Sequence, residues 1–414
     1  MRSKQQWILA LVLALAAGPA SATNGMRMIG FSPTQNAMGG ASVGAPLDAA
    51  TVATNPAGLL ETGLRLDVGA TYFDPTVKYT ATGGASGQEQ ESTRAASYIP
   101  SIAFSMPIGD RMAFGVGLFG AAGMGVDYPA DLYGSTTMTS YLQARVTPGF
   151  AYKLAPGLSA GVTLNAMMAQ MEYAVGGTQP PNGPGLLPRE KDTQFGVGAV
   201  IGLQWSPLPI LTVGAAYETK SFFSDFQFDI PAHNIAVPGV GIVPVPGGKE
   251  KLAFDQPSVI TVGASVRPLP GFVFAADLEY VRWSETNGKD MPEFTTDPNM
   301  TGMNPWNLNW DDQLVLKVGA ELPVFPLVKL RLGYNYGKMP LDETRAFENI
   351  AFPAIAESHF TGGLQVKVGP VAVSASAVYS PEAKISGGPP LQGLPTYESK
   401  MSQIALDLGA SMSF

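Results

Sequence analysis

The chain of 414 residues contains no cysteine. This absence excludes disulfide bonds, thiolate metal sites and a cysteine nucleophile together. Histidine is scarce as well, since His233 and His359 are the only two. No motif brings a serine or a second metal ligand to either of them at a diagnostic spacing. We therefore expect both histidines to be solvated loop residues, and we expect no metal site, no cofactor and no catalytic centre.

Charge is also sparse. Charged residues make up 14% of the chain, against about 25% in ordinary soluble proteins. The formal net charge is −8, and no cluster of Lys and Arg that could bind phosphates is present, so a nucleic-acid partner is not expected. Glycine, with 48 residues, is instead abundant. Low charge with high glycine suits a barrel that contacts outer-membrane lipid or detergent.

Long apolar runs are missing, and none reaches the roughly 20 residues that a membrane-spanning helix needs. The longest apolar stretch, residues 7–17, follows Arg2 and Lys4 and precedes Ala20-Ser21-Ala22. This order is typical of a secretory signal peptide, which predicts cleavage after Ala22. If the mature chain enters a membrane, it does so as strands.

What the sequence does contain is a repeated alternation of apolar and polar residues from Leu64 to Phe414. A period of two is typical of a strand with one face toward lipid and the other toward a polar lumen. The pattern predicts an all-β fold with strands near residues 64–72, 102–108, 112–118, 142–154, 158–164, 195–205, 211–217, 260–266, 272–280, 314–320, 328–336, 360–368, 371–379 and 404–414.

The connections between these segments alternate strictly between short and long. Short ones lie at 107–111, 155–157, 206–209, 267–271, 322–326 and 369–370, and longer ones at roughly 81–91, 121–140, 174–191, 230–248, 285–311, 339–357 and 383–398. Bacterial barrels have short periplasmic turns and longer outer loops. The pattern thus predicts a 14-stranded antiparallel transmembrane barrel over residues 64–414, which ends on the aromatic residue Phe414.

Residues 23–63 precede the barrel and are rich in Gly, Ala, Ser and Asn, with no apolar face long enough to bury itself. We interpret this segment as a hatch inside the lumen. Its most informative part is Asn55-Pro56-Ala57. Asn before Pro also initiates simple turns, but we favour an anchor in which the Asn55 amide bonds to backbone within the lumen and Pro56 fixes the bend.

Gly30-Phe31, Ala37-Met38-Gly39-Gly40-Ala41 and Asp48-Ala49-Ala50-Thr51, followed by Asn55-Pro56-Ala57, resemble the N-terminal hatch of the FadL-type outer-membrane transporters of long-chain fatty acids and hydrocarbons. Tyr280-Val281-Arg282-Trp283-Ser284 and Leu330-Arg331-Leu332-Gly333-Tyr334 extend the resemblance through the barrel. The resemblance implies a monomer that takes up hydrophobic small molecules passively, without cofactor or energy source. It also implies capture among outer loops and lateral exit where the third barrel strand kinks.

Candidate site residues follow from these patterns. Glycine within a strand marks a bulge, a kink or a close approach of another backbone, and the third strand carries Gly115, Gly117, Gly120, Gly123 and Gly125. We assign them to a lateral opening, with packing against the hatch as the alternative. Arg145, Lys317 and Arg331 fall on the polar parity of their strands and are candidates for binding a substrate carboxylate, although pairing with inward acids is an alternative. Ile235, Val237, Val240 and Ile242 offer an apolar mouth.

The main alternative function is a general porin for small polar solutes. A porin lumen is open and water-filled, which the hatch disfavours. An enzyme of the outer membrane would need an acid–base constellation that the sequence does not show. A larger energy-driven transporter would need a bigger plug and about 22 strands.

Overall fold

The computed structural model describes residues 24–82, 87–128, 137–174, 189–237, 240–288, 308–346, 348–388 and 396–414. The expected signal peptide, residues 1–22, lies outside the described residues. Most of the expected outer connections 174–191 and 285–311 lie outside them too.

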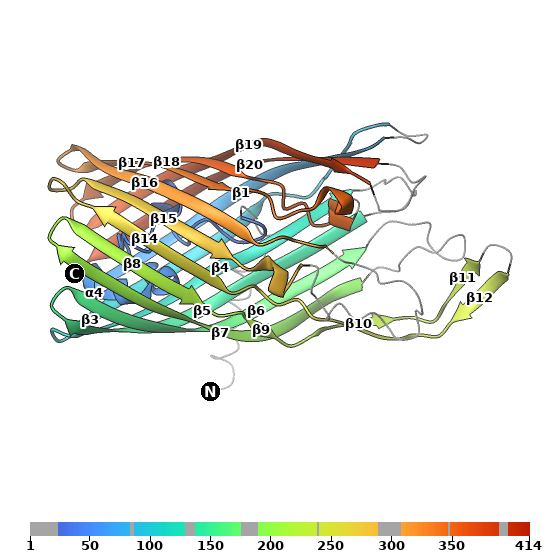
Figure 1. The fold of residues 1–414 in the computed structure, drawn as a ribbon, viewed down its shortest axis with the longest axis horizontal. Coiled ribbons are helices and arrows are strands. Elements are labelled where there is room, and N and C mark those ends of the chain that lie inside the picture. Colours follow the sequence, from blue (N-terminus) through green and yellow to red (C-terminus); the bar gives the residue numbers. More distant parts are fainter. Residues whose placement is uncertain are drawn as a thin grey trace.

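A closed wall of 14 antiparallel strands forms the molecule, as the alternation predicted (Figure 1). These strands are β1 (Arg65–Thr82), β3 (Ser97–Ile108), β4 (Met112–Tyr128), β5 (Thr137–Ala155), β6 (Leu158–Ala174), β7 (Arg189–Leu208), β8 (Leu211–Glu218), β14 (Val259–Val266), β15 (Val273–Val281), β16 (Gln313–Phe325), β17 (Val328–Gly337), β18 (Ser358–Val368), β19 (Val371–Gly387) and β20 (Thr396–Ser413).

Each wall strand pairs with its neighbours along the chain, and the first strand closes the ring with the last. β1 pairs with β20 from Arg65 opposite Ser413 to Thr82 opposite Thr396. Two short strands, β2 (Gln90–Glu91) and β9 (Phe222–Phe223), add to β1 and β7. Because the ring is closed, each wall strand has a neighbour on both sides, and most of its backbone polar groups bond to those neighbours.

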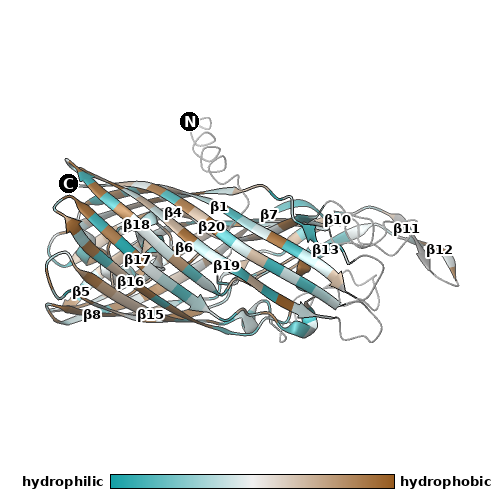
Figure 2. Cartoon of the chain, turned by 90° about the horizontal axis from the view of Figure 1, so that it is seen from above, coloured by the Kyte–Doolittle hydropathy of each residue, from teal (hydrophilic) through white to brown (hydrophobic). Residues whose placement is uncertain are grey.

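The two faces of the wall differ as a membrane barrel requires. Along β15, Phe274, Leu278 and Tyr280 are exposed on the outside, whereas Asp277 and Glu279 are buried on the inside. Figure 2 shows brown and teal residues alternating along the strands in the same way. Apolar residues on the outer face avoid the cost of placing polar groups in lipid.

The two ends of the barrel also differ (Figure 1). Tight turns join the strands at the end that carries the C-terminus, with Gly109, Gly157 and Gly369 in left-handed conformations there. At the opposite end, several strands run well beyond the predicted segments. For example, residues 121–128 and 137–140, expected in a loop, belong to β4 and β5. The prediction missed the β4 part because residues 120–125 are only Gly, Ala and Met and show no alternation of apolar and polar residues.

The expected loop 230–248 is a projecting ribbon. It consists of β10 (Phe226–Ile230) paired with β13 (Gly248–Leu252) and of β11 (His233–Val237) paired with β12 (Gly241–Val245). In Figure 1 it is the part that reaches farthest from the barrel. Its prolines and glycines indicated an irregular loop, but its Val and Ile residues favour strands.

The N-terminal segment, residues 24–63, lies inside the ring of strands (blue in Figure 1). It contains the short helices α2 (Pro33–Ala37), α3 (Thr51–Thr54), η1 (Pro56–Gly58) and α4 (Leu59–Thr62). Further single turns are η2 (Trp283–Glu285), η3 (Glu343–Arg345) and η4 (Glu348–Ile350). None of the helices in the described ranges is long and apolar enough to cross a membrane.

Candidate functional site

Asn55 ties the N-terminal segment to the wall. Its side-chain amide donates to the carbonyl of Val43 at 2.9 Å and to the carbonyl of Leu203, on β7, at 3.1 Å. Its side-chain oxygen accepts from the N–H of Ala57 at 3.3 Å, which caps η1, and Pro56 supplies the first residue of that turn. Since Asn55 is 0% exposed, these bonds satisfy groups that water does not reach.

Inward polar side chains of the wall bind the backbone of the same segment at several further points. Asp277 accepts from the N–H groups of Ser42 and Val43 at 2.7 and 2.9 Å. Thr361 accepts from Gly39 N–H and donates to the carbonyl of Ala37, both at 3.0 Å. A segment without a core of its own is thus held through its backbone, as buried irregular backbone requires.

Wall glycines create the space for these contacts. A Cβ at Gly214 would lie 2.1 Å from the carbonyl oxygen of Val43, and one at Gly202 would lie 2.0 Å from the Asn55 side-chain oxygen. At Gly333 a Cβ would lie 2.3 Å from the backbone nitrogen of Gly39. Sequence reasoning did not single out these glycines. The available signal was their place on the inward parity of strands whose other inward residues are polar.

The three candidate cations are inward and buried, and each meets a carboxylate. Arg145 on β5 contacts Glu218 on β8 at 2.6 Å, and Lys317 on β16 contacts Glu279 on β15 at 2.8 Å. Arg331 on β17 pairs with Glu321, close to the tight-turn end. These contacts match the alternative role as partners of inward acids, and Glu218 is a partner that sequence reasoning missed. A role in binding substrate stays a prediction.

Arg145 also fastens the N-terminal segment. Its guanidinium lies 4.2 Å from the ring centre of Phe31 and donates to the carbonyl of Ala53 at 3.3 Å. From the N-terminal segment, Arg27 reaches the second oxygen of Glu218 at 2.6 Å. We refer to Arg27, Arg145, Glu218, Glu279 and Lys317 as the charged layer.

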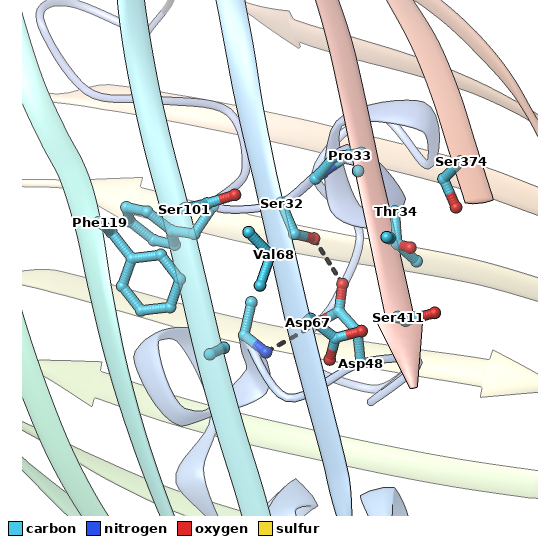
Figure 3. Close-up of a pocket in the computed structure, with 15 residues that line it drawn as sticks. Ser32, Pro33, Thr34, Asp48, Asp67, Val68, Ser101, Phe119, Ser374 and Ser411 are labelled. Carbon is cyan, nitrogen blue, oxygen red and sulfur yellow. Dashed lines mark hydrogen bonds between the residues drawn. The ribbon is translucent and has the colours of Figure 1, made fainter. Parts of the chain in front are cut away.

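Small cavities remain between the N-terminal segment and the wall. One of 30 Å³ borders the charged layer, and a second of 20 Å³ lies nearer the tight-turn end. In Figure 3 the second cavity lies among Phe119, Val68 and Ser411, with the Ser32 hydroxyl donating to Asp48. Neither holds more than about a water or two, so the segment fills the lumen closely at both places.

On the other side of the charged layer the lumen becomes apolar. We call this group of buried inward residues the apolar cluster. It includes Met26, Val77, Tyr79, Met124, Tyr128, Tyr141, Met171, Tyr173, Phe226, Phe228, Phe254, Val259, Val281, Trp283, Trp310, Val315, Phe352, Ile355 and Met401. The rings of Trp283 and Trp310 meet edge to face at 4.9 Å. The segment between β17 and β18 folds inward over the cluster, where Phe352 stacks on Phe254 at 6.0 Å.

The pairing of β4 changes beside this cluster. Its ladder with β3 ends at Phe119 opposite Ser101, whereas its ladder with β5 continues to Tyr128, with a bulge between Gly120 and Ala122. The next residue of β3 is Pro100, which lacks the N–H that a ladder needs. At the bulge the N-terminal segment takes over, since Gly123 N–H donates to the carbonyl of Met26 at 3.0 Å.

The five glycines of β4 divide between two roles. A Cβ at Gly115 would meet the Leu59 side chain, and one at Gly117 would meet the Phe119 ring. Both positions therefore face the interior in the fully paired part of the strand. Gly120 and Gly123 lie where β3 no longer pairs with β4, whereas a Cβ at Gly125 would meet the guanidinium of Arg94.

Residues 92–94 lie at the other end of this unpaired stretch, farther from the tight turns. Thr93 N–H donates to the carbonyl of Asp127 at 2.7 Å, and Arg94 donates to the hydroxyl of Ser140 on β5 at 2.9 Å. Burial lowers the pKa of Arg94 to about 10, so its side chain stays charged near neutral pH. The stretch over which β3 and β4 do not pair thus lies between Pro100 and Arg94. We call this unpaired stretch the gap.

Other predicted residues lie elsewhere. The expectation that His359 is a solvated loop residue is wrong, because it is 0% exposed within β18 and follows the inward parity of that strand. Ile235 and Val237 belong to β11, and Val240 and Ile242, at the far end of the ribbon, are 73% and 67% exposed. Within the described ranges, no group of three or more metal-binding side chains converges.

A closed barrel with a lipid-facing exterior and a lumen occupied by its own N-terminal segment defines a bacterial outer-membrane channel protein. The chain matches the family model described as outer membrane protein transport protein (OMPP1/FadL/TodX) over residues 13–355, and it belongs to this family. It is therefore an outer-membrane protein of a family of transport channels for hydrophobic molecules rather than of an enzyme family. A search of curated proteins found no match.

Solved structures share the fold. The toluene transporter TodX of P. putida is 18% identical with a TM-score of 0.72, and the match covers 93% of this chain and 99% of that one. The toluene transporter TbuX of Ralstonia pickettii is 19% identical with a TM-score of 0.66, covering 93% and 98%. A FadL homologue from Pseudomonas aeruginosa is 14% identical with a TM-score of 0.72, covering 94% and 100%.

Proposed function

We propose that this protein takes up hydrophobic small molecules passively, as a monomer, and releases them sideways through the wall between β3 and β4. The observation that carries this proposal is the end of the β3–β4 ladder at Phe119 beside a large apolar cluster. An apolar molecule within that cluster lies next to an interrupted stretch of wall, through which it can reach lipid without crossing the polar surface of the membrane. The toluene transporters with the same fold support a cargo of this kind.

Entry is proposed from the end that carries the projecting ribbon. Val240 and Ile242 expose apolar surface there, and exposed apolar patches commonly mark binding surfaces. The aromatic and Met side chains of the apolar cluster then offer a lumen site, because they adapt to varied apolar ligands. Most of the expected outer connections 174–191 and 285–311 lie outside the described residues, and we assign capture to the ribbon.

Two features favour an exit at the gap rather than elsewhere. Within a bilayer, irregular strand edges are tolerated only where protein or a cavity covers them, and here Met26 of the N-terminal segment covers the β4 edge. In addition, Tyr72 and Tyr98 lie on the outer face, with ring centres 5.6 Å apart, only two residues from Pro100. Aromatic residues gather at membrane interfaces, which favours release near the outer leaflet.

The exit is tested by adding bulk at the gap. Gly120→Trp places a large side chain where β3 and β4 part, and we expect uptake of radiolabelled toluene by cells to fall well below the wild-type rate because this side chain fills the proposed exit. Val116→Trp is the control on the same strand, at a position where the ladder with β3 is intact. Wild-type uptake by an assembled Gly120→Trp protein would disprove the lateral route.

The main alternative, a general porin, makes an opposite prediction. With residues 24–63 docked, we expect a channel for polar solutes to be closed, since the segment lies inside the ring of strands and two of the cavities beside it are small. We therefore propose that residues 23–63 act as a hatch. Steady ion conductance by the full-length protein in planar bilayers would favour the porin instead.

A further inference from the structure

We propose that Glu218 sets the substrate class of this channel: by neutralising Arg27 and Arg145 together, it restricts the cargo to uncharged hydrophobic molecules and excludes carboxylates. The inference rests on the proposed uptake function and narrows it. It starts from the geometry of the charged layer.

Glu218 uses both of its oxygens. One contacts Arg145 and the other contacts Arg27, each at 2.6 Å. Arg145 is held further by Phe31 and by the carbonyl of Ala53. A carboxylate ligand is bound best by a guanidinium with two donors to spare. Here the shared glutamate already takes the place of such a ligand.

The other charged groups in and near the layer also have partners. Lys317 contacts Glu279 at 2.8 Å, and Asp277 is occupied by the N–H groups of Ser42 and Val43. Farther out, Arg189 binds Glu250. Each of these cations is paired inside the lumen, so an incoming carboxylate would have to break an existing ion pair or remain without a partner.

The charged layer directly adjoins the proposed path. Val259 of the apolar cluster stands opposite Glu218 in the β8–β14 ladder and lines the same cavity as Arg27 and Glu218. Met26, which binds the β4 edge at the gap, precedes Arg27 in the chain. A molecule that travels from the cluster to the gap therefore passes the Arg27–Glu218 pair. An ion there pays the cost of leaving water, whereas a neutral apolar molecule does not.

The test compares matched neutral and anionic ligands on the purified full-length protein in detergent, at mildly alkaline pH where carboxylates are ionised. The pairs are hexadecanol with palmitate and toluene with benzoate. For the wild type we expect a preference for the neutral member of roughly 100-fold, in line with the burial of an ion that lacks a partner. Equal affinity within each pair would overturn the inference while leaving hydrophobic uptake in place. No binding of either neutral ligand would overturn the proposed function itself.

The variant Glu218→Gln then tests whether Glu218 is the residue that excludes carboxylates. Without the shared carboxylate, Arg27 and Arg145 should accept a ligand carboxylate, so palmitate affinity should rise at least about tenfold, as expected for one charge-assisted contact, with hexadecanol unchanged. Glu398→Gln is the control, because Glu398 also contacts two cations, Lys384 and Lys400, but on the exposed outer part of β19 and β20. An unchanged palmitate affinity in a folded Glu218→Gln protein would refute the role of Glu218. If that variant does not assemble, the wild-type comparison still decides the substrate class.

Discussion

The anchoring of the N-terminal segment can be tested most directly at Asn55. The variant Asn55→Ala removes two donors and one acceptor, and it leaves the carbonyls of Val43 and Leu203 and the N–H of Ala57 without this partner. A net contribution of about 1 kcal/mol for each hydrogen bond gives a loss of about 3 kcal/mol. Asn55 is completely buried, so water does not replace these bonds in the docked state.

The expected loss applies to docking of the segment rather than to the wall, whose strands do not depend on Asn55. A change of about 3 kcal/mol corresponds to roughly a 100-fold rise in transient undocking. Hydrogen exchange measured by mass spectrometry should show it as faster exchange of amides in residues 51–58, with the wall peptides unchanged. Asn234→Ala, at an exposed position of β11, is the control. Unaltered protection of residues 51–58 in Asn55→Ala would refute the anchor.

Three further outcomes follow from the same contacts. The Cβ of Gly214→Ala would lie 2.1 Å from the Val43 carbonyl oxygen, so this variant should weaken docking of the N-terminal segment by about 1–3 kcal/mol. Gly362→Ala, whose Cβ would lie 3.6 Å from its nearest atom, should leave docking unchanged. Hydrogen exchange of the amides in residues 42–44 measures docking in both variants. Equal behaviour of the two variants would contradict the close approach. Deletion of residues 24–60 should leave a folded barrel that conducts small ions in planar bilayers, because the wall closes without that segment. An unchanged conductance would show that the segment does not plug the lumen. The intact protein should also be β-rich by circular dichroism and should migrate differently on gels before and after heating, and a helical spectrum would contradict the fold.

The wall could be predicted from the sequence because lipid imposes one rule on every spanning strand. Residues such as Phe274, Leu278 and Tyr280 must be apolar on the outer face, and this produces a period of two that is visible without a structure. The same reasoning failed where the alternation is lost. β4 and β5 continue into residues expected to form a loop, and residues 120–125 of β4 contain only Gly, Ala and Met, so no period of two is visible there.

The interior was harder to predict because its partners are distant in sequence. Arg145 and Lys317 were identified as inward cations from parity alone, but parity does not reveal which acid each one meets. Glu218 is the last residue of β8, and only closure of the barrel brings it to both Arg145 and Arg27. The pairing of β4 was hidden in the same way. Its glycines lie partly where β4 pairs with β3 and partly at and beyond the bulge between Gly120 and Ala122, where that pairing has ended.

This dependence on closure explains why the N-terminal segment and the wall have complementary compositions. The segment has no apolar core of its own, so it is held by contacts with the wall, which include the backbone contacts of Ser42 and Val43 with Asp277 and the ion pair of Arg27 with Glu218. The wall, in turn, needs inward glycines and acids opposite the residues of the segment that they contact. On β8, for example, Gly214 faces Val43 and Glu218 contacts Arg27. Exchanging the segment for that of a relative only 18% identical should therefore disrupt docking even though both barrels share the fold. Full closure of such a chimera, measured as absent ion conductance, would mean that the fit depends on backbone shape alone and not on these side chains.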